Sequence, residues 1–180
     1  MKITLVAVTS LDGCITYGDE TDIYKWTSPE DQDFFFKKIQ ESKLIIMGSG
    51  TYEVIKSNIQ HSANRLRVVL TKHPEKYKKD EINGQLEFSD EMPSQLINRL
   101  SSFEEALLLG GSKVYSSFMR ESLVDEIYLT IEPTIFGKGK RLFNPYNLRS
   151  NWSLVSFKKL NDKGTILLRY KLVNPQRALK

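Results

Sequence analysis

Short runs of apolar, β-branched residues alternate with helical segments along most of this chain, and this alternation limits the possible folds more than any other feature. The predicted strands are the runs at 3–8, 44–48, 66–71, 86–88 and 106–111. Helical segments begin at Ser28-Pro29, near Thr51, at Pro93 and after Gly111. Strands joined by helices lie parallel in one sheet, because a parallel connection needs a crossover long enough to hold a helix. The sequence therefore predicts an α/β fold with a mainly parallel sheet.

From Val124 onward the pattern is typical of β structure alone. A β-rich stretch covers 124–137, and two further runs, 152–159 and 165–173, flank the turn sequence Asn161-Asp162-Lys163-Gly164. Two strands around such a turn predict an antiparallel hairpin, which we expect at one edge of the sheet. We find no internal repeat and no linker, so we expect a single domain over residues 1–180.

Composition narrows the classes of function and compartment. The formal net charge is +4, but basic and acidic residues are interleaved, so no basic face for nucleic acid is evident. The first apolar run is too short for a secretion signal, and no run approaches the ~20 apolar residues of a membrane span. Cys14 is the one cysteine, which suits a reducing compartment. We expect a cytoplasmic protein that binds neither nucleic acid nor membrane.

Metal binding is not expected. The two histidines, His61 and His73, have no partner at metal-ligand spacing, so the sequence predicts no metal site.

Three loops with small or hydroxyl residues follow predicted strands. They are Gly48-Ser49-Gly50-Thr51, Thr71-Lys72-His73 and Gly110-Gly111-Ser112. In open α/β sheets, ligands gather at the carboxyl ends of the strands. Two of these loops lead into helices, whose N-termini favour phosphate, and two such ends suit the two phosphates of a dinucleotide. The alternative is that the paired glycines only form a tight turn between strand and helix.

Six segments occur in the order and spacing found in dihydrofolate reductase and in the riboflavin-biosynthesis reductase domain. They are VTSLDGCIT, WTSPED, LIIMGSGTYE, RVVLT, LLLGGSKVYSSFM and VDEIYLTIEPTIFGKGKRLF. The chain therefore resembles the dihydrofolate-reductase-like superfamily over almost its whole length. The resemblance implies a three-layer sandwich with a mainly parallel central sheet and an antiparallel C-terminal hairpin. It also implies hydride transfer from NADPH to a nitrogen heterocycle or to its sugar-derived side chain.

The same resemblance implies a set of cofactor-binding residues. Gly48, Ser49 and Thr51 would meet the pyrophosphate, and Thr71 and Lys72 would lie near the adenosine ribose and its phosphate. The second phosphate-binding turn would comprise Gly110, Gly111, Ser112, Val114 and Tyr115. Lys72 favours NADPH over NADH, because a 2′-phosphate attracts a cation. Dihydrofolate reductases commonly carry an arginine where this chain has Ser49.

Asp31 is the candidate proton donor, because protonation of a ring nitrogen calls for a carboxyl group or a water that it holds. The resemblance implies that Thr130 partners this carboxyl group. It also implies substrate contacts from Trp26, Phe35 and Arg65, and places Asp12 at the mouth of the site. The alternative for Asp31 is structural, because it follows Ser28 by three residues, where a capping box has its acid.

The substrate is less sharply indicated than the reaction. The riboflavin enzyme has an arginine late in its first helix, where this chain has residues near Gln40. It has an acidic stretch where this chain has YEVIK, and a glutamate before the glycine pair where this chain has Leu109. The leading candidate is 5-amino-6-(5-phosphoribosylamino)uracil, and dihydrofolate is the alternative. A module that binds nucleotide without catalysis is the alternative of another class. By analogy with related reductases, we expect a homodimer.

Overall fold

The computed structural model describes residues 1–145 and 148–173. In chain order the strands and α-helices are β1 (Lys2–Ser10), α1 (Pro29–Glu41), β2 (Leu44–Gly48), α2 (Ser49–Ile55), β3 (Leu66–Leu70), β4 (Leu86–Ser89), α3 (Pro93–Arg99), β5 (Glu105–Leu108), α4 (Ser112–Arg120), β6 (Glu126–Glu132), β7 (Trp152–Lys159) and β8 (Ile166–Leu172). Three short 3₁₀ helices are η1 (Ile23–Lys25), η2 (Lys56–Asn58) and η3 (Pro74–Tyr77).

All eight strands form one sheet in the order β4-β3-β2-β5-β1-β6-β8-β7. The first six strands in this order run parallel to one another, while β8 is antiparallel to both β6 and β7. The mainly parallel sheet and the closing hairpin are thus as predicted. Because β1 lies between β5 and β6, the chain begins in the middle of the sheet.

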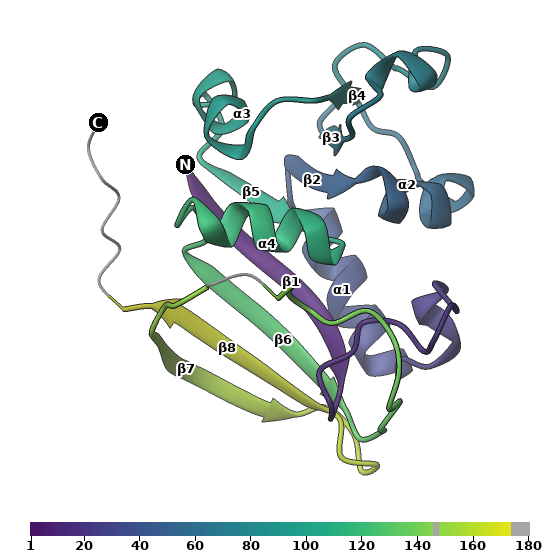
Figure 1. The fold of residues 1–180 in the computed structure, drawn as a ribbon, viewed down its shortest axis with the longest axis vertical. Coiled ribbons are helices and arrows are strands. Elements are labelled where there is room, and N and C mark those ends of the chain that lie inside the picture. Colours follow the sequence, from purple (N-terminus) through teal and green to yellow (C-terminus); the bar gives the residue numbers. More distant parts are fainter. Residues whose placement is uncertain (146–147, 174–180) are drawn as a thin grey trace.

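Helices cover both faces of the sheet, which makes three layers. On one face, α4 and α3 pack through Phe118, Leu96 and Leu100 against a cluster that includes Leu5 of β1. On the other face, α1 and α2 pack against a second cluster that includes Met47 of β2. In Figure 1, α4 crosses in front of β1 while α1 lies behind the sheet. Strands that are covered on both faces bury every side chain, as the fully buried β2 does.

Two predicted strand ends are wrong. The strand predicted at 106–111 is β5, which ends at Leu108, before the turn that Gly110 makes with a φ of +88°. The sequence predicts β structure from 124 to 137, but β6 ends at Glu132. Pro133 follows, and proline has no N–H with which to continue a strand ladder. The chain instead turns, since the N–H of Thr134 donates to the carbonyl of Glu132 over 2.8 Å. Glu132 therefore lies at the carboxyl edge of the sheet.

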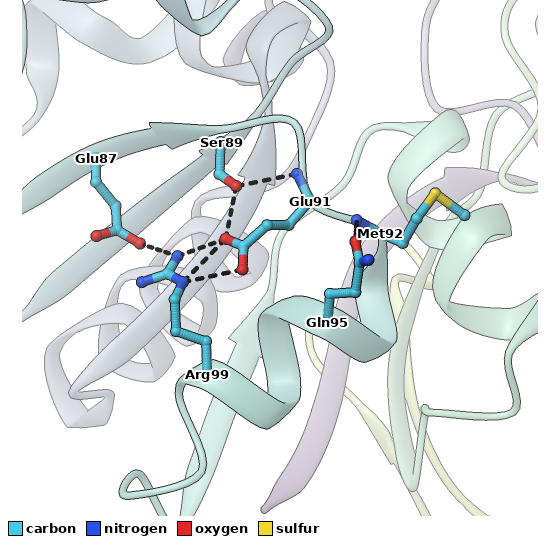
Figure 2. A network of polar contacts seen from close by, with 6 residues as sticks. All are labelled: Glu87, Ser89, Glu91, Met92, Gln95 and Arg99. Atoms are coloured by element: carbon cyan, nitrogen blue, oxygen red, sulfur yellow. Dashed lines mark hydrogen bonds and ion pairs between the residues drawn. The ribbon is translucent and has the colours of Figure 1, made fainter.

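An ion-pair network joins β4 to α3 (Figure 2). The guanidinium of Arg99 donates to both carboxylate oxygens of Glu91, at 3.0 and 2.9 Å from Nε, and to Glu87 at 2.6 Å. The Ser89 hydroxyl donates to Glu91 over 2.7 Å. Because Glu91 lies in the connection and is bonded to Ser89 of β4 and Arg99 of α3, the network holds the β4–α3 connection in place.

The β7–β8 hairpin lies at the end of the sheet, beyond α4 in Figure 1. Strand β7 is largely exposed, with 50% of Leu154 and 72% of Phe157 accessible to solvent. Leu154 lies opposite Tyr170 and Phe157 lies opposite Leu168. Since Leu168 and Tyr170 are two apart on β8, both apolar side chains project from the same face of the hairpin.

Among the described residues, no helix combines the length and the apolar character that crossing a membrane requires.

Candidate active site

A cavity of about 620 Å³ opens at the carboxyl ends of the parallel strands. Its lining includes the end of β2 at Gly48, Leu70 at the end of β3, and Leu109 just after β5. α1 contributes Asp31 and Phe35. The cavity is therefore where ligands gather in open α/β sheets, and it joins residues from both helical layers.

The two glycine loops lie side by side at this edge. The N–H of Gly48 donates to the carbonyl of Gly110 over 2.6 Å, which joins the end of β2 to the turn before α4. A side chain at Gly48 would bring its Cβ to 2.9 Å from Val114 Cγ2. The two loops are thus packed as one unit, and the glycine at position 48 permits this close approach.

Gly110 and Gly111 have different roles in the turn, and the peptide bond between them is cis. Gly110 has a φ of +88°, and a Cβ there would lie 2.7 Å from the ring of Tyr115, so the fold itself requires glycine. Gly111 lines the cavity, and a Cβ there would make an ordinary 3.7 Å contact with the Thr51 hydroxyl. The tight-turn interpretation is correct for Gly110, whereas Gly111 presents bare backbone to the cavity.

The N-terminus of α4 faces the cavity without a side-chain cap. Its N-cap residue is Gly111, and Ser112, Val114 and Tyr115 of its first turn also line the cavity. The Tyr115 hydroxyl donates to the carbonyl of Val6 on β1 over 2.5 Å, which fixes the helix to the central strand. An uncapped helix N-terminus attracts anions, because its first N–H groups have no acceptor within the helix.

Asp31 lies at the third position of α1, with 5% of its surface exposed. The Thr130 hydroxyl on β6 donates a hydrogen bond to its carboxyl group. The two predicted catalytic residues are therefore in contact, although they come from a helix and a strand far apart in sequence. Asp31 also lines the cavity.

The environment of Asp31 raises its pKa to about 6. The main cause is burial, which removes water from the charged form, and the charge of Glu132 adds to it. The hydrogen bond from Thr130 opposes both effects, because it stabilises the carboxylate. A carboxyl group with a pKa this close to neutrality can hold a proton and release it under ordinary conditions.

The predicted substrate residues are distributed unevenly. Phe35 lines the cavity beside Asp31, whereas Trp26, Asp12 and Arg65 lie outside the lining. The indole of Trp26 packs edge-on against Phe136 at 5.0 Å between ring centroids. The guanidinium of Arg65 donates to the main-chain carbonyls of Ser42, over 2.9 Å, and Gln40, over 3.0 Å, beside the end of α1.

Asp12 links the loop after β1 to the loop after β6. Its carboxylate accepts hydrogen bonds from the Ser10 hydroxyl at 2.6 Å and from the N–H groups of Phe136, at 3.1 Å, and Gly137, at 2.9 Å. These donors hold the pKa of Asp12 well below its usual range, with the Ser10 hydroxyl making the largest contribution. Both carboxylate oxygens are therefore engaged with the protein's own loops.

Thr71 and Lys72 also lie outside the cavity lining. They follow β3, where the N–H of Thr71 donates to the carbonyl of Ser89 over 2.9 Å and Lys72 is exposed. Their position is at the same carboxyl edge as the glycine loops, two strands along from β5 in the sheet order.

Sequence reasoning missed several residues of the site. Tyr24, Gln32 and Lys140 line the cavity, and Glu132 is buried near Asp31. The signal for Glu132 was its spacing of two from Thr130, because alternate residues of a strand share a face. Gln32 follows Asp31 in the predicted helix α1, whereas Tyr24 and Lys140 lie in segments whose route across the sheet edge is not encoded by local periodicity.

Residues 1–166 match the RibD C-terminal domain. The chain belongs to the RibD C-terminal domain family. Its sequence is also 30% identical, over 87% of the chain and 82% of the relative, to the dihydrofolate reductase of Bacillus subtilis. The family expected from the six sequence segments is therefore confirmed.

Solved structures share the fold of this family member. The deaminase/5-amino-6-(5-phosphoribosylamino)uracil reductase of Thermotoga maritima has a TM-score of 0.73 at 18% identity, covering 96% of this chain and 56% of that one. A dihydrofolate reductase of Enterococcus faecalis, complexed with NADP(H), has a TM-score of 0.68 at 19% identity, covering 95% and 96%. The dihydrofolate-reductase-like fold is thus confirmed.

Proposed function

We propose that this protein is an NADPH-dependent reductase that transfers hydride to a substrate of the pyrimidine or pterin type, either at its ring or at its sugar-derived side chain. The proposal rests on one cavity with two different borders. The glycine loops and the uncapped N-terminus of α4 form one border, and the buried carboxyl group of Asp31 lies at the other. The first border suits an anionic dinucleotide, and the second suits protonation of a ring nitrogen. Membership of a family whose relatives include reductases supports this combination.

The residues at the glycine loops fit a dinucleotide cofactor. Gly111 leaves bare backbone at the N-terminus of α4, while Ser49 and Thr51 bring hydroxyl groups to the opposite loop. These residues would hold the pyrophosphate. We propose that Thr71 and Lys72 lie near the adenosine ribose and that Lys72 favours NADPH, because its ammonium suits a 2′-phosphate. The NADP(H) complex of the similar Enterococcus enzyme supports this choice.

Bound NADPH supplies the hydride, and the chain's own residues manage the proton. Asp31, in its protonated form, holds a proton where it can donate to a ring nitrogen of the substrate. The Thr130 hydroxyl orients the Asp31 carboxyl group through its hydrogen bond. Phe35 and Ile23 form apolar walls beside Asp31 and exclude water from the reacting ring.

The charges of the lining do not by themselves decide the substrate. Among the described residues that line the cavity, the basic side chains are Lys113 and Lys140. Lys113 lies on α4, and Lys140 lies in the loop after β6. Around Asp31 the lining consists of apolar, aromatic, hydroxyl and amide side chains, which are Ile23, Tyr24, Thr27, Gln32 and Phe35. A substrate phosphate near α1 would have no cation there. The two carboxylates of dihydrofolate would lack a cation there as well, so the charges of the lining do not separate the two candidates. We propose 5-amino-6-(5-phosphoribosylamino)uracil as the leading substrate, supported by membership of the RibD C-terminal domain family, and dihydrofolate as the alternative.

Two measurements test the proposal. NADPH and NADH are first titrated against the intrinsic fluorescence of the protein, and saturable binding of NADPH is expected. NADPH oxidation is then followed with dihydrofolate and with the aminouracil ribosyl phosphate side by side. Turnover with the aminouracil alone supports the leading substrate, and turnover with dihydrofolate alone reverses that choice. Binding without turnover of either identifies a non-catalytic nucleotide-binding module, and no binding ends the enzyme proposal.

We also propose that the protein forms a homodimer through the β7–β8 hairpin. Strand β7 is the last strand of the sheet, and Leu154 and Phe157 are exposed on one face of it. In the proposed dimer, the β7 strands of two subunits pair in antiparallel register, centred on the middle of each strand. Leu154 of one subunit then lies opposite Phe157 of the other, and the lysines at 158 and 159 lie far from the same lysines of the other subunit. An interface that pairs with itself in this way has the symmetry of a two-fold dimer.

A further inference from the structure

Glu132 is a buried acid that joins three parts of the fold near the proposed active site. It is the last residue of β6, and 4% of its surface is exposed. One carboxylate oxygen accepts the N–H of Ser28 over 2.7 Å. The other accepts the hydroxyl of Thr165, in the turn before β8, over 2.6 Å. Both oxygens are thus engaged, one with the start of α1 and one with the hairpin.

The contact with Ser28 replaces half of an expected helix cap. Ser28 is the N-cap of α1, and its hydroxyl accepts the N–H of Asp31 over 3.4 Å. In a capping box, the acid three residues into the helix accepts the N–H of the cap residue in return. Asp31 occupies that position. The N–H of Ser28, however, donates to Glu132, so Asp31 is not used for the second half of the box.

We propose that Glu132 is a positioning residue: by accepting the N–H of Ser28, it takes the capping role that Asp31 would otherwise have and leaves the Asp31 carboxyl group to face the cavity. The significance for catalysis rests on the proposed function, because it assumes that Asp31 delivers the proton. The positioning of Asp31 by Glu132 does not rest on the proposed function, because it follows from which acceptor the Ser28 N–H uses.

Glu132 also acts on Asp31 through its charge. It lies two residues from Thr130 on β6, hence on the same face, and its charge contributes to the raised pKa of Asp31. The other titratable groups that line the cavity with Asp31 are Tyr24 of η1, Lys113 and Tyr115 of α4, and Lys140 of the loop after β6. On α1 itself, the carboxylate of Glu30 is engaged with the amide of Asn161 over 3.0 Å.

Two substitutions separate the hydrogen bond from the charge. Glu132→Gln keeps an oxygen that accepts the Ser28 N–H but removes the charge. We expect its maximal kcat to stay within about threefold of the wild type, with the pKa of its pH profile modestly lowered because the charge of Glu132 is gone. Glu132→Ala removes the acceptor, so Asp31 turns back to cap Ser28. We expect kcat to fall roughly tenfold or more, with unchanged NADPH affinity.

Titration of the Asp31 carboxyl carbon by NMR gives a readout that does not depend on activity. The pKa of Asp31 should fall modestly in Glu132→Gln and further in Glu132→Ala, where Asp31 becomes a helix cap. Thr165→Val is the matched control, because it removes the other hydrogen bond of Glu132 without changing any charge. It should leave the pKa of Asp31 close to that of the wild type.

The outcomes distinguish the two proposals. If the wild type does not oxidise NADPH with either candidate substrate, the proposed function fails. The NMR titration then still decides whether Glu132 positions Asp31. If Glu132→Ala keeps both the wild-type kcat and the wild-type pKa of Asp31, the positioning role is wrong. If Glu132→Ala does not fold, Glu132→Gln provides the test. An unchanged pKa of Asp31 and an unchanged pH profile in Glu132→Gln would overturn the proposal that the charge of Glu132 acts on Asp31.

Discussion

The hydroxyl group of Thr130 donates a hydrogen bond to the carboxyl group of Asp31. Thr130 lies on β6, next to the central strand of the sheet, and Asp31 lies in the first turn of α1. The hydrogen bond therefore fixes the helix start relative to the sheet at the border of the cavity. It also connects a group that can hold a proton with a rigid strand, which limits how far the carboxyl group can move.

Replacing Asp31 should separate chemistry from cofactor binding. In Asp31→Asn, we expect kcat to fall roughly 10²–10⁴-fold, because an amide cannot supply the proton. NADPH affinity should stay within about twofold, because the glycine loops are unchanged. Stopped-flow hydride transfer and fluorescence titration measure the two quantities. Undiminished turnover would show that another group, or solvent, delivers the proton.

The same substitution should increase stability at alkaline pH. The pKa of Asp31 is raised from 3.8 to about 6 in the folded protein, so the folded state binds this proton more tightly than the unfolded state. The free energy of unfolding therefore decreases as pH rises from about 4 to 6, by about 3 kcal/mol for a shift of this size. Asp31→Asn should be more stable than the wild type at pH 8 and equal to it below pH 4. Urea unfolding at both pH values measures this difference.

Activity should depend on pH through the same group. Below about pH 6 Asp31 is protonated and can donate, and above it the protonated fraction falls tenfold per unit. We expect kcat to decline as pH rises through 6, with a slope that approaches −1 on a logarithmic plot. Asp31→Asn should abolish this slope. A profile that rises with pH would mean that the carboxylate form is the active one.

Charge at position 49 should control the affinity for NADPH. Ser49 is the first residue of α2 and lines the cavity beside Gly48. Ser49→Asp should weaken NADPH binding roughly tenfold, and Ser49→Arg should tighten it, because the pyrophosphate is an anion. Without ligand, Ser49→Asp should melt at or slightly above the wild-type temperature and Ser49→Arg slightly below it, because the N-terminus of a helix favours an acid over a cation. Equal affinities in both variants would place the phosphates elsewhere.

The network around Arg99 should contribute a small, salt-sensitive increment of stability. Arg99 and Glu91 are partly exposed, so we expect a coupling free energy of about 0.5–1 kcal/mol between them. A double-mutant cycle with Arg99→Met and Glu91→Gln, followed by urea unfolding, isolates this value. The coupling should decrease in 1 M salt, and NADPH affinity should be unaffected. A coupling that persists in high salt would indicate a contribution from packing instead.

The exposed face of β7 should hold the dimer together. Phe157→Glu places a charge on the apolar face of the hairpin and should weaken self-association roughly 100-fold or more. Ser156→Glu is the matched control, because Ser156 lies opposite Arg169 on the other face of the same strand. Sedimentation equilibrium of the three proteins measures the dissociation constants. A wild-type protein that is monomeric at high concentration would contradict the dimer.

Local patterns in the sequence determined much of this protein. Short apolar runs defined the strands, Ser28-Pro29 defined the start of α1, and the turn at 161–164 defined the hairpin. These features depend on neighbours within a few residues, where hydrophobic period and capping preferences act. The glycine loops and the candidate pair of Asp31 and Thr130 were also predicted, through the resemblance of six segments to a known superfamily.

Only the tertiary structure decided how these parts meet. The parallel pairing of β5 with β2 brings the loops after these two strands together, and local sequence does not specify strand order. Asp31 stands where a capping box has its acid, but the distant Glu132 accepts the Ser28 N–H, so Asp31 is not used for that half of the box. Gly110 is required by the ring of Tyr115, whereas Gly111 borders the cavity. These assignments depend on which acceptor a given N–H uses and on which side chain fills a given space. The groups involved are far apart in sequence, so only the folded structure brings them together.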